Sequence, residues 1–364
     1  MCTMGSSFQF FSKDMNKKKV VVGMSGGVDS SVCALLLKQQ GYEVIGLFMK
    51  NWEEKDPDGI CKSSKDYEDV IRVCEQIDIP YYTVNFVQEY RDNVFSHFLE
   101  ELKLGYTPNP DILCNREIKF KVFFEKAMSL GADYLATGHY CQIGEENQLL
   151  KGLDPNKDQS YFLYTIQSSV LKKVLFPIGD MLKTRVREIA KEHQLATSAK
   201  KDSTGICFIG KRNFKEFVGS YLAYQKGPFQ TLDGKVVGEH DGIAYYTIGQ
   251  RKGLRIGGAG DAWFVVAKDV ARNVVFVEQG DDHPSLYKEE LTAIDPSWVM
   301  GSAPSFPLTC TAKIRYRQAD QPCVVTALGE KIHVRFLKPQ RAVTQRQAIV
   351  FYDGPVCLGG ATIE

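Results

Sequence analysis

Two short stretches of this 364-residue chain carry residue types suited to chemistry on a phosphate and on sulfur. GMSGGVDSS (residues 23–31) combines glycines with serine hydroxyls. Glycines let backbone N–H groups approach a ligand closely, and a loop that leads into a helix N-terminus favours an anion. KKDSTGICFIGKRNF (residues 200–214) places one thiol, Cys207, between two apolar residues. Core packing and sulfur chemistry both remain open for Cys207 on this local evidence.

The loop at residues 23–31 follows neither common phosphate-binding pattern. It has no lysine in the G-x-x-x-x-G-K-[ST] position, and its glycines lack the G-x-G-x-x-G spacing. Asp29 is placed to influence a magnesium ion or to cap the helix that follows. A tight strand-to-helix turn without a ligand is the alternative interpretation.

The elements around this loop predict an α/β fold. The β-branched run at residues 20–22 indicates a buried strand, residues 30–41 a helix ended by Gly41, and residues 42–50 a second strand. Strand, loop, helix and strand in this order begin a doubly wound parallel sheet, and the pattern continues to about residue 200. Short β runs between glycine turns then indicate a mainly-β domain and a β-barrel. We expect an extension at 1–16 and domains at 17–206, 207–288 and 289–364.

Composition narrows the class of protein. The chain is 44% hydrophobic and 24% charged, which is ordinary for a soluble globular protein. No apolar run approaches the roughly 20 residues of a membrane span, and the N-terminus does not read as a signal peptide, so we expect a cytoplasmic protein. The ten cysteines contain no C-x-x-C pair, and there are six histidines. Reduced cysteines, mostly in the core, are therefore expected, without a structural zinc site.

Positive charge gathers in two regions, although the net charge is only +1. Residues 183–215 hold nine Lys/Arg and three Asp/Glu, and residues 310–352 hold eight Lys/Arg and two Asp/Glu. Such regions on a neutral protein indicate a localised surface for a polyanion. Ordinary solvated surface is the alternative.

The loop S-G-G-x-D-S after a first strand resembles the pyrophosphate loop of ATP pyrophosphatases, which adenylate an oxygen of their substrate. Five further strings occur in order, and together with the loop they resemble the tRNA-specific 2-thiouridylases from about Lys19 to the C-terminus. These strings are TPNPDILCNREIKF (107–120), LATGHY (135–140), DQSYFLY (158–164), KKDSTGICFIG (200–210) and YYTIGQRKGL (245–254). The resemblance implies an ATP pyrophosphatase-like first domain and ATP-dependent 2-thiolation of the wobble uridine of tRNA.

The resemblance also implies roles for individual residues. Cys114 would be the nucleophile or resolving thiol, and Cys207 would carry a persulfide. ATP would be bound by Gly23, Met24, Ser25, Gly26, Gly27, Val28, Asp29, Ser30, Met49 and Gly138. The target base would meet Asn109, Pro110 and Asp111, and tRNA would contact Lys157, Asp158, Gln159, Arg315 and Tyr316. Magnesium would act without a dedicated protein cage. The expected partners are tRNA and a protein sulfur donor, with no membrane, and the free protein is expected to be monomeric.

The chemistry has a physical rationale. Adenylation converts the C2 oxygen of uridine into a better leaving group. A persulfide on Cys207 can then deliver sulfur, either by direct attack or after release as hydrosulfide. A Cys114 thiolate would cleave the S–S bond and leave a Cys114–Cys207 disulfide. Asp111 is either a base for this step or a cap of the following helix. His139 is expected to be a structural hydrogen-bonding residue. The cations around Cys207, at 200, 201, 211 and 212, are expected along tRNA phosphates.

Two other function classes stay open on the sequence. One is an ATP-dependent ligase for a small metabolite, whose basic regions are only solvated. The other is a non-catalytic RNA-binding protein with a relic nucleotide loop. Binding of tRNA excludes the first, and release of AMP and pyrophosphate only in the presence of tRNA excludes the second.

Overall fold

A computed structural model describes residues 17–53, 62–202 and 213–364. Its first domain is built on a five-stranded sheet in the order β3-β2-β1-β4-β7. Every neighbouring pair in the sheet is parallel. This confirms the predicted doubly wound parallel sheet. The strands are β1 (Lys19–Met24), β2 (Glu43–Lys50), β3 (Tyr81–Asn85), β4 (Tyr134–Ala136) and β7 (Val174–Leu175).

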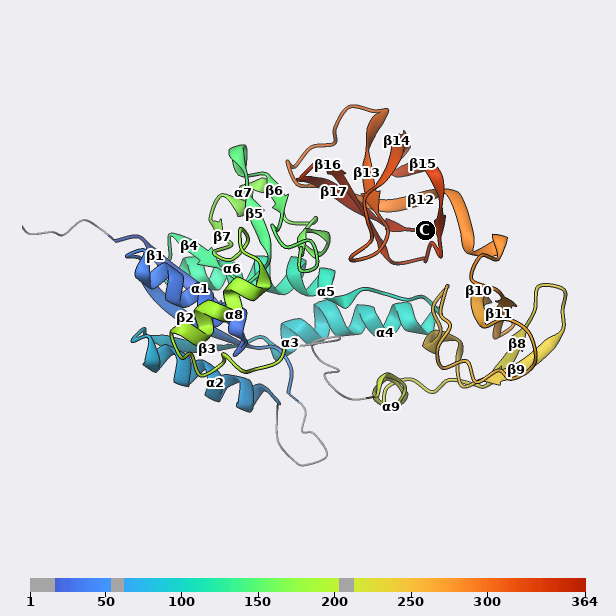
Figure 1. Cartoon of the computed structure of the whole chain (residues 1–364), viewed down its shortest axis with the longest axis horizontal. Coiled ribbons are helices and arrows are strands. Elements are labelled where there is room, and N and C mark those ends of the chain that lie inside the picture. Colours follow the sequence, from blue (N-terminus) through green and yellow to red (C-terminus); the bar gives the residue numbers. More distant parts are fainter. Residues whose placement is uncertain (1–16, 54–61, 203–212) are drawn as a thin grey trace, which may run out of the picture.

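Helices cover both faces of this sheet, because successive side chains of a strand point to opposite sides. Val20 and Val22 pack with α1 (Val28–Gln39), α2 (Lys62–Gln76) and α8 (Lys183–Glu192). Val21 and Leu47 pack on the other face with α6 (Phe123–Ser129) and α7 (Ser168–Leu171). A helical run then extends toward the β domains (Figure 1): α3 (Val87–Tyr90), the π-helix η1 (Arg91–Phe95) and α4 (Ser96–Lys103).

The last domain is a closed antiparallel barrel, as predicted. Six strands follow the order β12-β15-β14-β13-β16-β17, and pairing of β12 with β17 closes the ring. The hairpin β5 (Cys141–Ile143) and β6 (Leu149–Lys151) of the first domain continues this sheet at β17. The barrel strands are β12 (Tyr287–Trp298), β13 (Leu308–Lys313), β14 (Gln321–Leu328), β15 (Lys331–Arg341), β16 (Ala348–Asp353) and β17 (Val356–Ile363).

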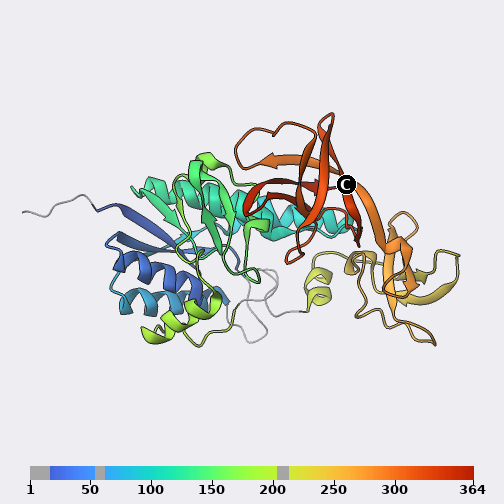
Figure 2. The ribbon, with the colours of Figure 1, turned by 45° about the horizontal axis from the view of Figure 1, so that its top comes forward.

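The central part is a small β domain (Figure 2), as expected from its short β runs and glycine turns. Its sheet has the order β10-β11-β8-β9. The helix α9 (Phe214–Gly219) packs against η1 and α4 of the first domain through Phe217 and Val218. The strands are β8 (Gly227–Gln230), β9 (Val236–His240), β10 (Trp263–Asp269) and β11 (Val274–Gln279). Among the described residues, no helix is both long enough and apolar enough to cross a membrane.

Candidate active site

The predicted phosphate loop lies at the switch point of the parallel sheet. Strand β1 has β2 on one side and β4 on the other, and ligands of doubly wound sheets bind where the connections diverge in this way. The loop that follows β1 meets the loop that follows β4. A Cβ on Gly138 would lie 3.0 Å from the backbone nitrogen of Ser30 and 3.1 Å from the Cβ of Asp29. Gly138 is therefore adjacent to the first turn of α1.

Serine hydroxyls hold the shape of the loop from within. The Ser30 hydroxyl accepts a hydrogen bond from the Ser25 backbone N–H at 3.1 Å, and the Ser31 hydroxyl donates to the Gly27 carbonyl at 2.8 Å. Gly26 has a φ of +71°, and a Cβ there would overlap the backbone carbonyl of Asp66. The loop conformation therefore requires glycine at position 26.

The side chains of several predicted ATP-binding residues pack against the protein itself. Met24 and Val28 are 2% and 3% exposed, so only their backbones are available to a ligand. Met49 is half-buried and packs against the hydrophobic clusters on its side of the sheet. Gly23 faces the ring of Phe123, 3.3 Å from an ideal Cβ position. The backbone of the loop, rather than these side chains, is what the site can offer to phosphate.

Asp29 is the partner of a lysine from a distant part of the chain. The Lys183 ammonium lies 2.6 and 2.8 Å from its two carboxylate oxygens, and the Tyr140 hydroxyl donates to it at 2.8 Å. Burial raises the pKa of Tyr140, so the phenol stays protonated and donates. The N-cap of α1 is Gly27, without a side-chain cap, so the capping interpretation of Asp29 is wrong.

Lys200 supports the phosphate loop from behind. Its ammonium donates to the Gly26 carbonyl at 2.9 Å and lies 2.8 and 2.6 Å from carboxylate oxygens of Asp66 and Asp69 on α2. Lys200 therefore has intramolecular partners, and its contact with tRNA phosphates stays a prediction. Lys201 is exposed, whereas Cys207, Lys211 and Arg212 lie outside the described residues.

The segment with Asn109, Asp111 and Cys114 forms a short helix that continues into a π-helix. The helix α5 (Pro110–Leu113) begins with buried Pro110 in its first turn. Asn109 caps it, because its side chain accepts from the Asp111 backbone N–H at 3.2 Å. The capping alternative for Asp111 is therefore wrong. Burial raises the pKa of Asp111, although the charge of Lys119 acts to lower it. A carboxylate with a raised pKa is a stronger proton acceptor, which suits a general base.

Cys114 opens the π-helix η2 (Cys114–Val122) and is 2% exposed. π-Helical turns are rare and occur frequently at functional sites. The neighbouring Asn115 is also buried, and its amide donates to the Phe162 carbonyl at 3.1 Å. Cys114 is thus held on a rigid, packed element, whereas the distance to Cys207 involves a residue outside the described ones.

His139 has a structural place, as expected. It is 7% exposed, its Nδ1 lies 2.8 Å from the Thr137 hydroxyl, and its Nε2 lies 3.5 Å from the Lys119 ammonium. Burial, together with the charge of Lys119, lowers its pKa well below the usual range. A neutral imidazole follows, with Nε2 as acceptor and Nδ1 as donor. His139 thereby contacts Lys119, whose charge also acts on Asp111.

All three domains contact the segment that leads to Asn109. Lys268 of β10 donates to the Gly105 carbonyl, and also to the Tyr246 carbonyl at 2.9 Å. The Thr107 hydroxyl lies 3.3 Å from that of Thr247 in the central domain. Gln347 of the barrel domain donates to the Thr107 carbonyl at 2.5 Å. The position of the predicted target-base residues therefore depends on how the domains are assembled.

The predicted tRNA residues at 157–159 have intramolecular partners. Lys157 lies 2.6 Å from a carboxylate oxygen of Asp202. Asp158 is 5% exposed and accepts from the backbone N–H groups of Gly152 and Ser160, both at 3.1 Å. Gln159 accepts from the Tyr140 N–H at 3.0 Å. Asp158 is a buried residue with a structural role, whereas Lys157 and Gln159 are half-buried.

Arg315 and Tyr316 lie where the barrel meets the other domains. One Arg315 nitrogen donates to the carbonyls of Ile248, at 3.2 Å, and Ala342, at 2.7 Å. The ring of Tyr316 lies 4.6 Å from that of Phe162, centroid to centroid. Burial, followed by the nearby charge of Arg341, lowers the pKa of Arg315. Contacts of this pair with tRNA stay a prediction.

Most other described cysteines are core residues, as expected. Cys33, Cys74, Cys141 and Cys357 are at most 1% exposed, and burial raises the pKa of each thiol. Cys310 and Cys323 face each other across β13 and β14 with their sulfurs 3.8 Å apart. Buried thiols with a raised pKa are poor nucleophiles. Cys61 lies outside the described residues.

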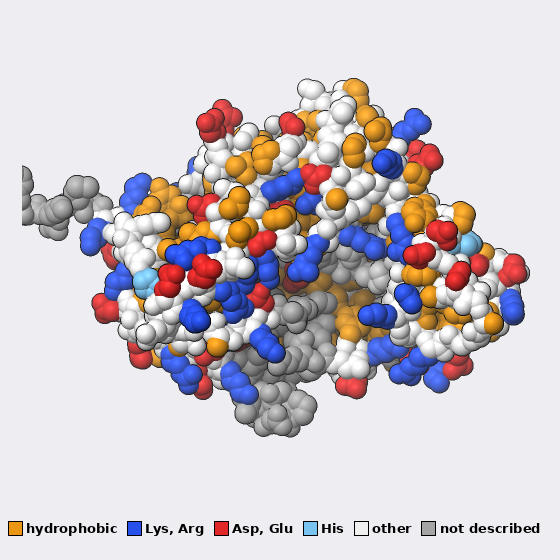
Figure 3. Space-filling model, in the orientation of Figure 1, with side chains coloured by type: hydrophobic (Ala, Val, Ile, Leu, Met, Phe, Trp, Pro, Cys, Tyr) orange, Lys and Arg blue, Asp and Glu red, His pale blue; other side chains and the backbone are white. Residues whose placement is uncertain are grey.

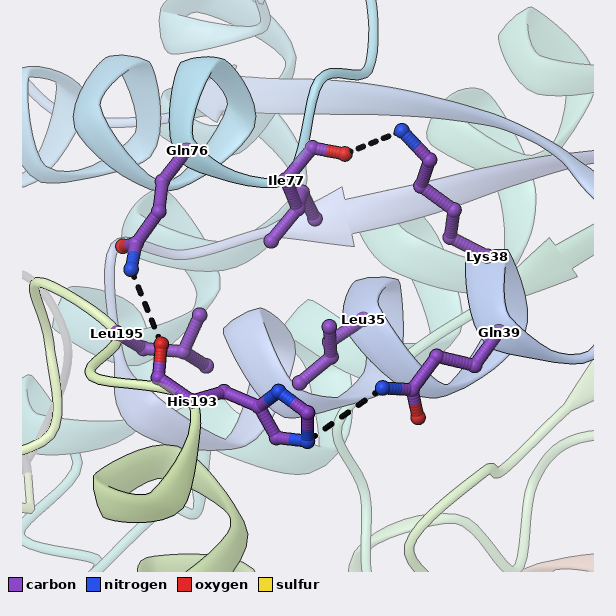
Figure 4. A pocket seen from close by; sticks show the side chains of 7 residues that line it. All are labelled: Leu35, Lys38, Gln39, Gln76, Ile77, His193 and Leu195. Carbon is purple, nitrogen blue, oxygen red and sulfur yellow. Dashed lines mark hydrogen bonds between the residues drawn. The ribbon is translucent and has the colours of Figure 1, made fainter.

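A cavity of about 410 Å³ lies away from the phosphate loop, where α1, α2 and α8 end (Figure 4). Gln76 closes it by donating to the carbonyls of His193 and Gln194, at 3.1 and 2.9 Å. Lys38 donates to the Ile77 carbonyl at 2.5 Å. These contacts satisfy carbonyls at helix ends, as the termini of packed helices require. We assign no ligand to this cavity, because the polar groups that line it bond to carbonyls at the helix ends.

Four residues of the site were not predicted from the sequence: Tyr140, Lys183, Lys119 and Lys268. Tyr140 was within a quoted string, LATGHY, and its position directly after the Gly-His pair was the only available signal. Lys183 is 154 residues from Asp29 in the chain, and no local pattern connects them. Only the assembled sheet brings α8 to the first turn of α1.

The fold and site define a class of protein: a nucleotide-binding α/β domain followed by two β domains. Family models match all three, as a tRNA methyl transferase HUP domain at 18–211, a tRNA methyl transferase PRC-barrel domain at 215–279 and an aminomethyltransferase beta-barrel domain at 288–363. The tRNA-specific 2-thiouridylase MnmA of Protochlamydia amoebophila is 63% identical over 354 residues, which cover 96% of this chain and 94% of that protein. Those of Bacillus pumilus and Bacillus subtilis are 61% and 58% identical, each over 95% of both chains. The chain belongs to the tRNA-specific 2-thiouridylase family, which confirms the resemblance found in the sequence.

Proposed function

We propose that this enzyme replaces the C2 oxygen of the wobble uridine of tRNA by sulfur and consumes one ATP per turnover. The observation that carries the proposal is the meeting of a glycine-constrained anion loop after β1 with Gly138 after β4. The segment with Asp111 and Cys114 leads into η2, which packs on the same sheet through Phe120. A phosphate site and a thiol-bearing helix on one sheet are what adenylation followed by sulfur transfer requires.

In the first step the C2 oxygen attacks the α-phosphorus of ATP, and pyrophosphate leaves with the electron pair of the broken P–O bond. Backbone N–H groups at 25–30 and the N-terminus of α1 would hold the phosphates. ATP enters as its magnesium complex, since Mg²⁺ is commonly held by substrate phosphates with few protein ligands. The described residues contain no cluster of three or more His, Cys, Asp or Glu side chains placed for a metal ion.

In the second step the terminal sulfur of a Cys207 persulfide attacks C2, and AMP leaves. The Cys114 thiolate then attacks the Cys207 sulfur, which releases 2-thiouridine and joins Cys114 to Cys207 in a disulfide. An external thiol reductant restores both cysteines. Asp111, three residues before Cys114 and with a raised pKa, would accept the proton of the Cys114 thiol.

Lys and Arg side chains gather on one face around the middle of the molecule, between the first domain and the β domains (Figure 3). We assign this face to the tRNA backbone, and Lys157, Gln159, Arg315 and Tyr316 remain the proposed tRNA contacts. Binding should weaken steeply as salt rises, because phosphate contacts release counterions. An unpaired wobble base costs little to turn into a pocket. A separate protein would supply the sulfur, and the free enzyme would be a cytoplasmic monomer.

Mass spectrometry of unmodified tRNA after incubation with ATP, magnesium and a persulfide donor tests the proposal directly. The expected product carries sulfur in place of oxygen on the wobble uridine and appears only when ATP is present. Methylation would give a different mass gain and would contradict thiolation. AMP and pyrophosphate release without tRNA would instead favour the ligase of a small metabolite.

Asp111→Asn tests the proposed base. We expect thiolation to fall by about 100-fold or more. In the wild type, the acid limb of kcat/KM should lie above the usual carboxyl range, because burial raises the pKa of Asp111, and the variant should lose that limb. The pKa of Asp111 is higher in the folded than in the unfolded protein, so the folded state disfavours ionised Asp111. The contribution of Asp111 to the free energy of unfolding therefore decreases as pH rises from its unfolded pKa through its folded pKa. The variant should therefore unfold at no lower temperature near neutral pH.

The exposed Glu125→Gln on α6 is the matched control for loss of a carboxylate, and its activity should equal that of the wild type. An Asp111→Asn enzyme with an unchanged rate and acid limb would show that Asp111 is not the base.

A further inference from the structure

The phosphate loop has no lysine of its own, yet the structure places one at its helix. Lys183 is the first residue of α8, and its ammonium binds both carboxylate oxygens of Asp29, at 2.6 and 2.8 Å. Its side chain is only 12% exposed. Asp29 is in the first turn of α1, whose free N–H groups face the predicted phosphates. The ammonium is thus held beside the anion site.

Helix stability does not explain a lysine at this position. A cation in the first turn of a helix opposes the helix dipole, and α8 has no acidic residue in its first turn and no side-chain cap. Instead the Lys183 backbone N–H is fixed by a carboxylate oxygen of Asp154 at 3.0 Å. The start of α8 is therefore oriented so that the Lys183 side chain reaches Asp29.

The ammonium of Lys183 is shared between two carboxylates. It lies 2.9 Å from Asp202, which also binds Lys157 at 2.6 Å and Arg187 at 2.5 Å. Burial acts to raise the pKa of Asp202, but the hydrogen bonds from Lys157 and Lys183 hold it well below its usual range. The cluster thus holds three cationic side chains and two carboxylates, Asp29 and Asp202, and its net charge is +1.

This excess is suited to an incoming polyanion. If Lys183 turns from Asp202 toward a phosphate, Asp202 keeps two cationic partners and is not left unpaired. Asp29 would keep the Tyr140 hydroxyl at 2.8 Å. The rearrangement therefore leaves no buried charge without a partner, which is the usual obstacle to moving a buried lysine.

We propose that Lys183 is a ligand of the ATP phosphates and stabilises the charge that develops there during adenylation, with Asp29 and Asp202 holding its ammonium in readiness. The inference rests on the proposed adenylation step. As uridine O2 bonds to the α-phosphorus and the bridging P–O bond breaks, negative charge grows on the phosphoryl oxygens and on the leaving pyrophosphate. An ammonium within reach of both stabilises that state more than the ground state.

Lys183→Met and Lys183→Arg test the proposal, with Lys191→Met as the matched control. Lys191 is an exposed lysine in the last turn of the same helix. For Lys183→Met we expect tRNA-dependent AMP release to fall by about 100-fold and KM for ATP to rise, with tRNA binding unchanged. Arginine keeps the charge and should restore part of the rate. AMP release by Lys183→Met at the wild-type rate would overturn the proposal.

A double variant separates a phosphate ligand from a mere ion-pair partner. If Lys183 only neutralises Asp29, then the double variant should release AMP at the rate of Asp29→Asn alone, and that result would overturn the proposal. A phosphate ligand predicts that the double variant stays slower than Asp29→Asn alone, while its melting temperature recovers. If Lys183→Met fails to fold, AMP release is compared in the double variant, whose folding is expected to recover.

Wild-type enzyme assayed in parallel identifies a failure of the proposed function itself. Thiolation by the wild type without ATP would contradict adenylation. A wild type that needs ATP, together with a fully active Lys183→Met enzyme, would contradict only the role of Lys183.

Discussion

Cys207→Ser and Cys114→Ser enzymes are each expected to lose thiolation by at least about 1,000-fold while ATP binding survives, since neither hydroxyl can carry or exchange sulfur. The two variants should fail at different steps. Without Cys207 no persulfide is loaded, so the tRNA stays free of sulfur. Without Cys114 the persulfide can still attack C2, but in a single turnover without a thiol reductant nothing cleaves the resulting S–S bond. The expected product is tRNA joined to Cys207, which a small thiol releases as 2-thiouridine.

Denaturing gels with and without reductant, followed by nucleoside mass spectrometry, measure both outcomes. Cys310→Ser is the control, because Cys310 is a half-buried thiol in the barrel strand β13. It should form free 2-thiouridine at the wild-type rate. A fully active Cys207→Ser enzyme would exclude the persulfide mechanism. A Cys114→Ser enzyme that turns over without an adduct would assign resolution to an external thiol.

The layered architecture could be predicted because local patterns determine it. The run Val20–Val22 is buried on both faces of a parallel sheet, and continuous β-branched residues are typical of such strands. Glycine turns between short β runs likewise indicated the two β domains. The closure of the barrel by pairing of β12 with β17 depends on contacts about 70 residues apart, so only the barrel class could be anticipated.

The position of the loop after β1 could be predicted for a similar reason, since its glycines and hydroxyls are contiguous, and its binding of phosphate stays a prediction. The partners of Asp29 could not, because Tyr140 and Lys183 reach it through strand order and helix packing. Local pattern also did not show that Lys200, which lies in a basic stretch, faces Asp66 and Asp69. Charge along the sequence does not show which side chains already have partners. Likewise, the π-helix that presents Cys114 has no distinctive sequence period.

Gly26→Ala should reduce ATP affinity by about 100-fold, whereas Gly27→Ala in the same loop should change it by no more than about threefold. Gly26 has a φ of +71°, which costs a residue with a Cβ roughly 1–2 kcal/mol. The new methyl group would also overlap the backbone carbonyl of Asp66, which cannot rotate away as a side chain could. Gly27 has a φ of −95°, and a Cβ there meets only the Ser25 hydroxyl at 3.3 Å.

Calorimetric titration with ATP compares the two variants, and melting temperatures show whether each is folded. The strain in Gly26→Ala is small against the whole stability of a domain, so the protein should stay folded while the loop changes shape. The backbone N–H groups would then no longer converge on the phosphates, and AMP release should fall in parallel with affinity. Equal affinities of the two variants would mean that ATP does not depend on the loop conformation. In that case the anion site would have to be sought elsewhere on the sheet.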